Sequence, residues 1–129
     1  MRAVMYTLKH YPEIKKWWLK QGHHIVPERY LSTRGVVIEQ DGKPIAACWL
    51  YVTDAAFCLF DHAVVSPEIR RKERSKAMDL CTDTLLDIAK GMGFERAILI
   101  TKTQSLISRL KRHGFKVLSN DTSMLVRGL

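Results

Sequence analysis

The stretch VVSPEIRRKERSKA, residues 64–77, joins the end of an apolar strand to a long amphipathic helix through a short basic turn. Such a junction predicts an α/β fold, and it leaves the amides of the first helical turn free to bind an anion. Phosphate-binding turns usually contain glycine, because the backbone must approach the ligand closely. This turn has no glycine, so the residues that predict an anion site also argue against a tight phosphate loop.

The helix after this turn is expected to run from Arg74 to about Lys90, because its apolar residues recur at intervals of three and four. Its opposite face carries three aspartates that the pattern places in solvent, namely Asp79, Asp83 and Asp87. The segment RAILIT, residues 96–101, then reads as a strand. Because a strand–helix–strand crossover joins parallel strands, residues 57–65 and 96–101 are predicted to lie parallel.

The clearest local signal is a β-hairpin. Asp41-Gly42 provides a two-residue turn between GVVIEQ, residues 35–40, and KPIAACWLYV, residues 43–52. A third apolar run, AAFCLFDHAVV at residues 55–65, extends the hairpin into an antiparallel meander. This run lacks polar alternation, so we expect a central strand that is covered on both faces.

The N-terminal segment predicts a strand followed by a helix. Residues 4–8 form the strand, and Pro12 opens a helix that ends at Gly22. The spacing of Trp17 and Trp18 within this helix favours core packing over a stacking platform for bases.

The C-terminal segment predicts one more helix, over about Gln104–His113, followed by an antiparallel pair of strands at residues 115–118 and 122–126. Together these elements predict a single α/β domain over residues 1–129. Its sheet is mixed and mostly antiparallel, with a βαβ crossover and helices on both faces.

The composition fits one soluble domain. The chain has 129 residues, 47% of them apolar, which is enough for a single core. No apolar run approaches the roughly 18 residues of a membrane span, and the first residues do not resemble a signal peptide. We therefore expect a cytoplasmic protein whose separated cysteines are reduced core thiols, namely Cys48, Cys58 and Cys81.

The charge balance narrows the class of partner. The chain carries 21 Lys and Arg against 13 Asp and Glu, a formal charge of +8. A surplus of this size favours a polyanion as the binding partner, whether nucleic acid, an acidic protein or a phosphorylated cofactor. The alternative is a basic surface that only keeps the protein soluble and binds no specific anion. His23 and His24 have no further ligand at a suitable spacing, so we expect no metal site.

The order of elements resembles the GNAT N-acetyltransferase superfamily over about residues 35–127. In that family's motif, a strand leads to proline, two residues, Arg or Gln, two residues, Gly, one residue, and Gly or Ala. Pro67 and Arg70 match this motif, whereas Glu73 and Ser75 stand at the two glycine positions.

A second segment, SRLKRHGF at residues 108–115, is similar to the place where the family's fourth helix ends in Gly-Phe. Leu110 stands where the family often has a proton-donating tyrosine. The glycine-poor turn itself is similar to that of small phage-encoded GNAT proteins. Thr53-Asp54 and Glu73-Arg74 match that subgroup.

The resemblance implies acetyl-CoA as co-substrate, bound where the strands at residues 57–65 and 96–101 splay apart. Its pyrophosphate would lie on the amides of residues 71–76, which agrees with the partial positive charge of a helix N-terminus. Glu73 opposes an anion there unless its side chain turns outward and pairs with a neighbouring cation. The residues expected to bind the cofactor are Ala63, Val64, Val65, Arg70, Arg71, Lys72, Arg74, Ser75, Lys76 and Thr101.

For acetyl transfer, His62 is the residue best suited to take a proton from an attacking amine, with Asp61 beside it. Because neighbouring strand residues point to opposite faces, only one of the two is expected to face the acyl group. The family's usual base position falls near Phe60, on the predicted face of His62. A structural core histidine is the alternative. Candidates for the acid that protonates the departing thiolate are water, Ser105, Ser108 and, more remotely, Tyr51.

Two functional hypotheses stay open. In the first, the protein is an acyl-CoA-dependent N-acyltransferase that acetylates an amine on a protein, a small molecule or a modified nucleobase. In the second, it is a non-catalytic GNAT-like protein that binds nucleic acid or an acidic partner through its basic surface. Pro67 and Arg70 favour the first hypothesis, whereas Glu73, Ser75 and Leu110 favour the second. A monomer or a homodimer is expected in either case.

Overall fold

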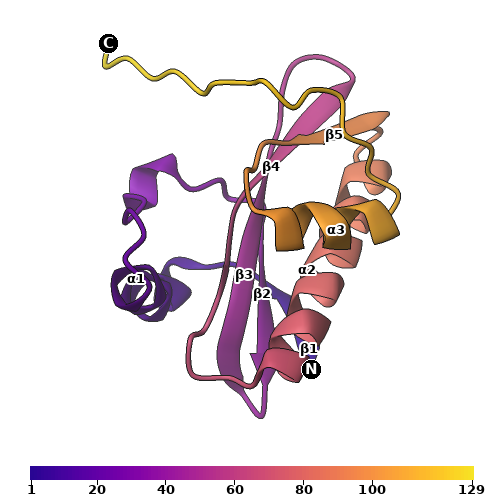
Figure 1. Cartoon of the computed structure of the whole chain (residues 1–129). Helices are drawn as coiled ribbons and strands as arrows, with labels where there is room; N and C mark the ends of the chain where they lie inside the picture. The colour runs from indigo at the N-terminus through magenta and orange to yellow at the C-terminus, as the bar shows by residue number, and fades with distance from the viewer.

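The centre of the molecule is a five-stranded sheet whose strands lie in chain order (Figure 1). The computed structural model describes all residues, 1–129. The strands are β1 (Arg2–Met5), β2 (Gly35–Gln40), β3 (Lys43–Tyr51), β4 (Phe57–Val65) and β5 (Arg96–Leu99). The first three pairings are antiparallel and the β4–β5 pairing is parallel, which confirms the predicted mixed sheet.

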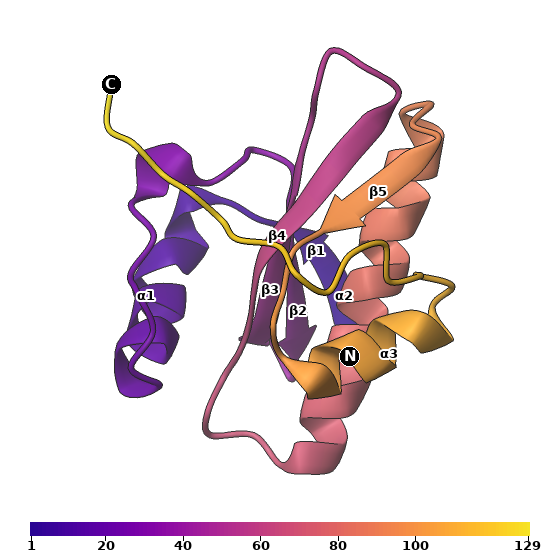
Figure 2. The same cartoon turned by 45° about the horizontal axis from the view of Figure 1, so that its top comes forward.

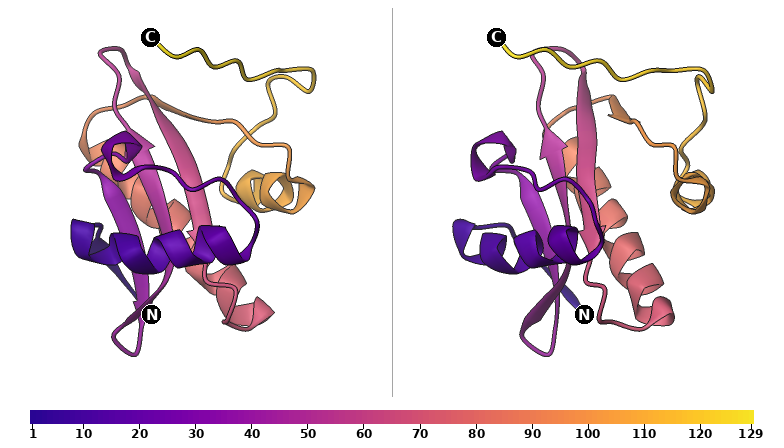
Figure 3. Two further views of the ribbon diagram at one scale, coloured as in Figure 1. Left: turned by 90° about the vertical axis from the view of Figure 1, so that its left-hand side faces the viewer. Right: turned by 60° about the vertical axis from the view of Figure 1, so that its left-hand side comes forward.

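Helices cover both faces of this sheet, as predicted (Figures 1 and 3). One face carries α1 (Tyr11–Lys20), and the other carries α2 (Arg71–Gly91) and α3 (Gln104–Arg112). Two short 3₁₀ helices, η1 (Leu8–His10) and η2 (Glu28–Tyr30), flank α1 in the chain. None of the helices combines the length and the apolar character that crossing a bilayer demands.

The predicted hairpin between β2 and β3 forms at Asp41-Gly42. Both residues have positive φ, 53° for Asp41 and 76° for Gly42. This is the backbone of a type I′ turn, whose twist matches the twist of the paired strands. The turn sets the pairing beside it, Gln40 opposite Lys43, and the register then shifts by one residue between Glu39 and Ile38.

The α2 side of the sheet holds the larger core. The periodic apolar residues of α2 are buried against β2, β3 and β4, which confirms the predicted helix face. Cys48, Cys58 and Cys81 are all buried and unpaired, as expected of core thiols.

The α1 side of the sheet is filled by aromatic rings. Trp17 and Trp18 are only 2% and 4% exposed, which confirms that both pack into the core. The Trp18 and Trp49 rings lie 6.0 Å apart, and Tyr6 meets Trp49 edge-on at 5.2 Å. Gly35 lies directly beneath the Trp49 ring, where a side chain would have no space.

Two strand predictions need correction. β1 covers Arg2–Met5 and not residues 4–8, and its last contact with β2 is the hydrogen bond of 2.8 Å that the Tyr6 amide donates to the Gly35 carbonyl. The central strand that is covered on both faces is β3, whereas β4 alternates between buried and exposed residues. The exposed positions of β4 include Leu59, although it pairs with Ile98 of β5.

The predicted strands at residues 115–118 and 122–126 are absent. The tail after α3 crosses the top of the molecule without pairing to β5 (Figure 2). Leu118, Leu125 and Val126 are 82%, 87% and 90% exposed, so beyond Phe115, which packs on the core, neither apolar run finds a surface to cover. A two-stranded hairpin is marginal by itself and needs a third element to pack against, which explains why strand propensity alone misled the prediction.

Candidate functional site

β4 and β5 separate partway along their length. Their pairing runs only from Phe57 opposite Arg96 to Phe60 opposite Leu99, where β5 ends (Figure 2). Residues 61–65 of β4 therefore have no strand on their β5 side. The expected splay is present, and it exposes backbone that can pair with an extended ligand.

A β-bulge lies at the point where the strands separate. Ala47 pairs with Val64 and Trp49 pairs with Asp61, so two residues of β4 lie opposite Cys48 alone. The extra residue is His62, whose φ of 59° is unusual for a residue other than glycine. Bulges of this kind redirect side chains, and they are common beside functional sites.

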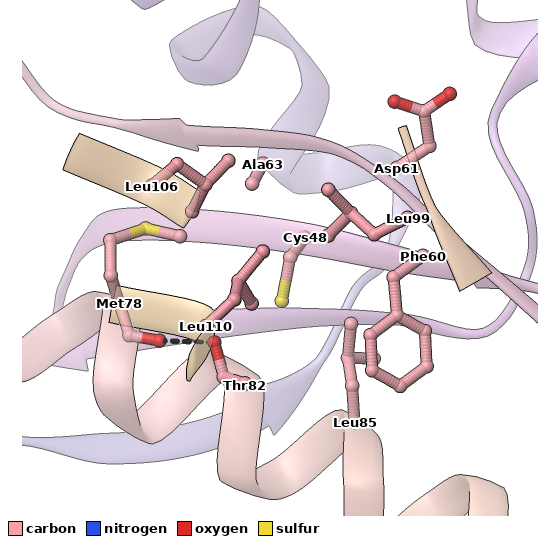
Figure 4. A pocket seen from close by; sticks show the side chains of 10 residues that line it. All are labelled: Cys48, Phe60, Asp61, Ala63, Met78, Thr82, Leu85, Leu99, Leu106 and Leu110. Carbon is pink, nitrogen blue, oxygen red and sulfur yellow. Dashed lines mark hydrogen bonds between the residues drawn. The ribbon is translucent and has the colours of Figure 1, made fainter. Parts of the chain in front are cut away.

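The bulge brings together the two residues that were predicted to face apart. The His62 amide donates a hydrogen bond of 2.7 Å to Asp61 Oδ1, and His62 Nδ1 lies 3.8 Å from the same oxygen. The assumption that neighbouring residues point to opposite faces therefore does not hold at this position, because the bulge interrupts the two-residue alternation. Asp61 also lines the cavity under α3, although its carboxylate points away from the rest of the lining (Figure 4).

His62 lies on the α1 side of the sheet, against Tyr51. The two rings meet edge-on with centroids 5.8 Å apart, and the Tyr51 hydroxyl donates to the Tyr30 carbonyl at 2.7 Å. Burial, and to a smaller extent the negative charge of Asp61, raises the pKa of Tyr51 to about 12. Tyr51 therefore stays protonated at neutral pH and acts as a hydrogen-bond donor that fixes the wall behind His62.

Phe60 does not share a face with His62, contrary to expectation. Its ring packs against Phe115 in the α2-side core, with ring centroids 6.2 Å apart. His62 packs on Tyr51 on the other side of the sheet. The bulge between them is the reason, since it shifts the side-chain alternation of β4 by one residue.

The N-terminus of α2 presents free backbone donors, but fewer than predicted. Arg74 is the first residue whose amide is bonded to the preceding turn, donating to the Arg70 carbonyl at 2.9 Å. The amides of residues 71–73 thus lack a helical partner, and no side chain caps them. The amides of residues 74–76 are already used by the helix, which corrects the expected span of 71–76.

The side chains of this turn divide into two groups. The Arg74 guanidinium folds back and donates to the carbonyls of Pro67 and Ile69, at 2.8 and 3.1 Å. It therefore braces the turn from within and does not face outward as a ligand-binding cation would. The outward cations are exposed and form no ion pair, and they are Arg70, Arg71, Lys72 and Lys76.

Other predicted cofactor residues are already engaged within the protein. The Ser75 hydroxyl accepts a hydrogen bond from Arg109, and Thr101 Oγ1 accepts one from the Thr103 amide. Val64 is buried in the α1-side core, and the Val65 carbonyl accepts a hydrogen bond from Gln21 Nε2 at 3.0 Å. Glu73 is half-buried and makes no ion pair, so the outward pairing considered for it is not present.

A small apolar cavity of about 20 Å³ lies between α2, α3 and the splayed strands (Figure 4). Ala63 of β4 and Leu99 of β5 line it from the sheet, and Leu106 and Leu110 line it from α3. Ala63 is the one predicted cofactor residue whose side chain reaches this space.

Two residues that carry no signal in the sequence, Arg109 and His113, tie α3 to α2. Arg109 Nη1 donates to the Ser75 carbonyl at 3.0 Å and lies 3.2 Å from Asp79 Oδ1. His113 Nε2 is 3.0 Å from Asp79 Oδ1, and its Nδ1 is 2.9 Å from Asp83 Oδ1. We call these five residues the α3 clamp.

The α3 clamp corrects the expectation that the aspartates of α2 form a solvated face. Asp79 and Asp83 both contact α3, and of the three only Asp87 is exposed without a partner. Burial alone would raise the pKa of Asp79, but hydrogen bonds from His113 and Arg109 outweigh it and hold that pKa below its usual value.

This lowered pKa predicts how the clamp responds to acid. A carboxyl with a depressed folded-state pKa stabilises the fold above its unfolded value of about 3.9 and loses that effect as the pH falls further. We expect Asp79→Asn to melt below the wild type at pH 7, with the gap closing between about pH 4 and pH 2 in melts followed by circular dichroism. Asp87→Asn should match the wild type throughout, and a gap that persists at pH 2 would contradict this origin.

No group of three or more His, Cys, Asp or Glu side chains is arranged to hold a metal ion. His23 and His24 are exposed in the connection after α1 and have no such neighbours.

No family model matches the sequence, and no curated protein matches it significantly. Solved structures, however, share the whole fold. A crystal structure described as a probable acetyltransferase superimposes with a TM-score of 0.73 at 18% identity, over 99% of this chain and 100% of that one.

Two further solved structures carry more specific descriptions. Rv2747 from Mycobacterium tuberculosis, solved in complex with CoA, gives a TM-score of 0.74 at 16% identity, over 95% of this chain and 76% of that one. The ribosomal-protein-S18-alanine N-acetyltransferase from Escherichia coli gives a TM-score of 0.67 at 16% identity, over 92% of this chain and 79% of that one. At such identities the likeness establishes architecture, and the chain therefore has the fold of the GNAT acetyltransferases.

Proposed function

We propose that the protein is an N-acyltransferase that moves the acetyl group of acetyl-CoA to an amine on a protein, a small molecule or a modified nucleobase. The observation that carries the proposal is the open edge of β4 at residues 61–65, one short turn before the unbonded amides of α2. An open strand edge suits the amide groups of a pantetheine arm, and a helix N-terminus suits a diphosphate. The likeness to a protein solved with CoA supports the same assignment.

The turn before α2 fits a diphosphate without glycine. The amides of residues 71–73 supply the backbone donors, and Arg71, Lys72 and Lys76 supply exposed positive charge. Glu73 weakens the site by repulsion of on the order of 1 kcal/mol at surface screening, which the surrounding cations outweigh in number. Arg74 contributes indirectly, because it holds the carbonyls of the turn and keeps them away from the anion.

His62 would serve as the general base. In the reaction, the amine nitrogen forms a bond to the thioester carbonyl carbon, the carbon–sulfur bond breaks, and the amine proton passes to His62. Asp61 holds the bulge through the His62 amide, and its carboxylate lies near the ring that would carry the proton. CoA leaves as a thiolate and takes a proton from water, since the Tyr51 hydroxyl already donates to Tyr30.

The second hypothesis, a non-catalytic protein that binds nucleic acid or an acidic partner, has one observation in its favour. The unpaired cations at the start of α2 form an exposed basic cluster on a chain of net charge +8. Under the first proposal the protein is cytoplasmic and either monomeric or homodimeric. The Thr53-Asp54 and Glu73-Arg74 pairs favour the phage-encoded subgroup.

Ligand-induced thermal shifts test the proposal. Millimolar acetyl-CoA should raise the Tm of the wild type by several degrees, because a ligand that binds only the folded state stabilises it. The double variant Arg71→Ala, Lys72→Ala should lose most of this shift. Arg74 is left intact, because its loss would release the turn as well as a charge.

The matched control is Lys15→Ala, Lys16→Ala, which removes the same charge from α1 on the opposite face of the sheet. It should keep the full shift. If acetyl-CoA has no effect while a short DNA duplex binds with steep salt dependence, the proposal is wrong and the nucleic-acid alternative replaces it.

A further inference from the structure

The cavity beneath α3 is too small to hold the pantetheine arm of acetyl-CoA. The cavity between α2, α3 and the splayed strands measures about 20 Å³, room for about one water molecule. Clefts that hold organic ligands usually measure about 300–1,000 Å³. Leu106 and Leu110 of α3 fill the remainder of the splay (Figure 4). A pantetheine arm therefore cannot enter the space beneath α3 while the helix keeps this position, although Ala63 itself is exposed at the rim of that space.

Little apolar contact holds α3 in place. Leu110 is the single buried residue of α3, whereas α2 buries six. The main ties between the two helices are the polar contacts of the α3 clamp, made by Arg109 and His113. When such a helix moves it gives up only one buried side chain of its own, although it also uncovers buried residues beneath it, among them Phe60 and Met78.

The contacts of the α3 clamp hold α3 against α2. The two ring nitrogens of His113 lie 2.9 Å from Asp83 Oδ1 and 3.0 Å from Asp79 Oδ1, so one side chain engages two carboxylates of α2. Arg109 Nη1 adds a contact to the Ser75 hydroxyl at 2.8 Å, on the second turn of α2. The clamp thus closes the helix over the cleft beside the cations that would hold the diphosphate.

We propose that α3 is a gate on the acetyl-CoA cleft and that the α3 clamp keeps it shut until the cofactor binds. The proposal rests on the proposed function. A protein that binds its ligand only in an open state shows an affinity lowered by the fraction of molecules that are open. Changes that weaken the clamp should therefore tighten cofactor binding while they lower the Tm. Substitution of a residue that contacts the ligand would instead weaken acetyl-CoA binding.

The test compares the acetyl-CoA affinity of the wild type with that of Asp83→Asn and His113→Gln by titration calorimetry. Asp83 is suitable because its carboxylate contacts only His113 and its side chain is 63% exposed, so the fold should tolerate the change. We expect each variant to bind acetyl-CoA on the order of threefold to tenfold more tightly. Asp87→Asn is the matched control, since it removes the same charge one turn further along α2, and its affinity should equal that of the wild type.

Hydrogen exchange gives a second readout that needs no cofactor. The amides of residues 107–112 in α3 should exchange severalfold faster in both clamp variants, while those of α1 exchange as in the wild type. Unchanged exchange in α3 would overturn the gate, because the clamp would then not be what holds the helix.

The affinities separate failure of the gate from failure of the proposed function. Equal or weaker binding by both clamp variants, with measurable binding by the wild type, overturns the gate alone. No binding by any of the four proteins overturns both the gate and the proposed function. Binding by the clamp variants with none by the wild type supports the gate in its strongest form.

Discussion

His62→Asn is expected to lower kcat for acetyl transfer about 100-fold or more, because a positioned general base typically contributes 10²–10⁴ to the rate. Asparagine is the substitution of choice at this position. It tolerates the positive φ of 59° that the bulge imposes, so the backbone is kept while the proton acceptor is lost. The rate is measured as release of the CoA thiol with an amine acceptor found by screening a panel of amines.

The same variant should bind acetyl-CoA within about twofold of the wild type, since His62 lies on the α1 side of the sheet, away from the α2 turn. His24→Asn, in the exposed connection after α1, is the matched control and should be fully active. A His62→Asn enzyme that keeps more than half of the wild-type kcat would assign His62 a structural role in the bulge.

Gly35→Ala is expected to destabilise the fold by about 2 kcal/mol, in the range typical of overpacked cores. A β-carbon at this position would lie 2.4 Å from Trp49 Nε1 and 2.7 Å from Tyr6 Cβ. Trp49 is fully buried and packed against Trp18, so its ring cannot turn aside. For a domain of 129 residues the change corresponds to a fall in Tm of about 7 °C.

Gly91→Ala provides the comparison for this prediction. Gly91 ends α2, and a β-carbon added there would meet nothing within 4 Å. Alanine also favours a helix more than glycine does, so the Tm of this variant should equal or slightly exceed that of the wild type. If Gly35→Ala melts within about 2 °C of the wild type, the Tyr6 and Trp49 packing is looser than the distances indicate.

The parts of the fold that follow from short-range rules could be predicted from the sequence. Asp41-Gly42 fixes a hairpin because its two residues accept positive φ, and the periodicity of α2 fixes a helix because its apolar face must be buried. The junction around Pro67 likewise placed the start of α2 to within a few residues. Each of these signals is contained within one element or one turn.

The parts that depend on contacts between distant segments could not be predicted in this way. The bulge at His62 lies in the register of β4 on β3, and the modest enrichment of histidine at positive φ is too weak a signal to predict it. Periodicity places Asp79 and Asp83 on one face of α2, but it does not reveal that α3 lies on that face. The sequence therefore identified residues such as His62 and Ser75 as candidates. Only the structure shows that His62 packs against Tyr51 and that Ser75 is bonded to Arg109.

The gathering of all three tryptophans on one side of the sheet has a practical consequence. Trp17, Trp18 and Trp49 share the α1-side core, and none lies near α3. Intrinsic fluorescence will therefore report on the α1 layer and remain almost silent when α3 moves. A reporter of gate opening has to be introduced as an extrinsic dye, and the exposed Ser108 on α3 is a natural attachment point once changed to cysteine, since the native thiols are all buried.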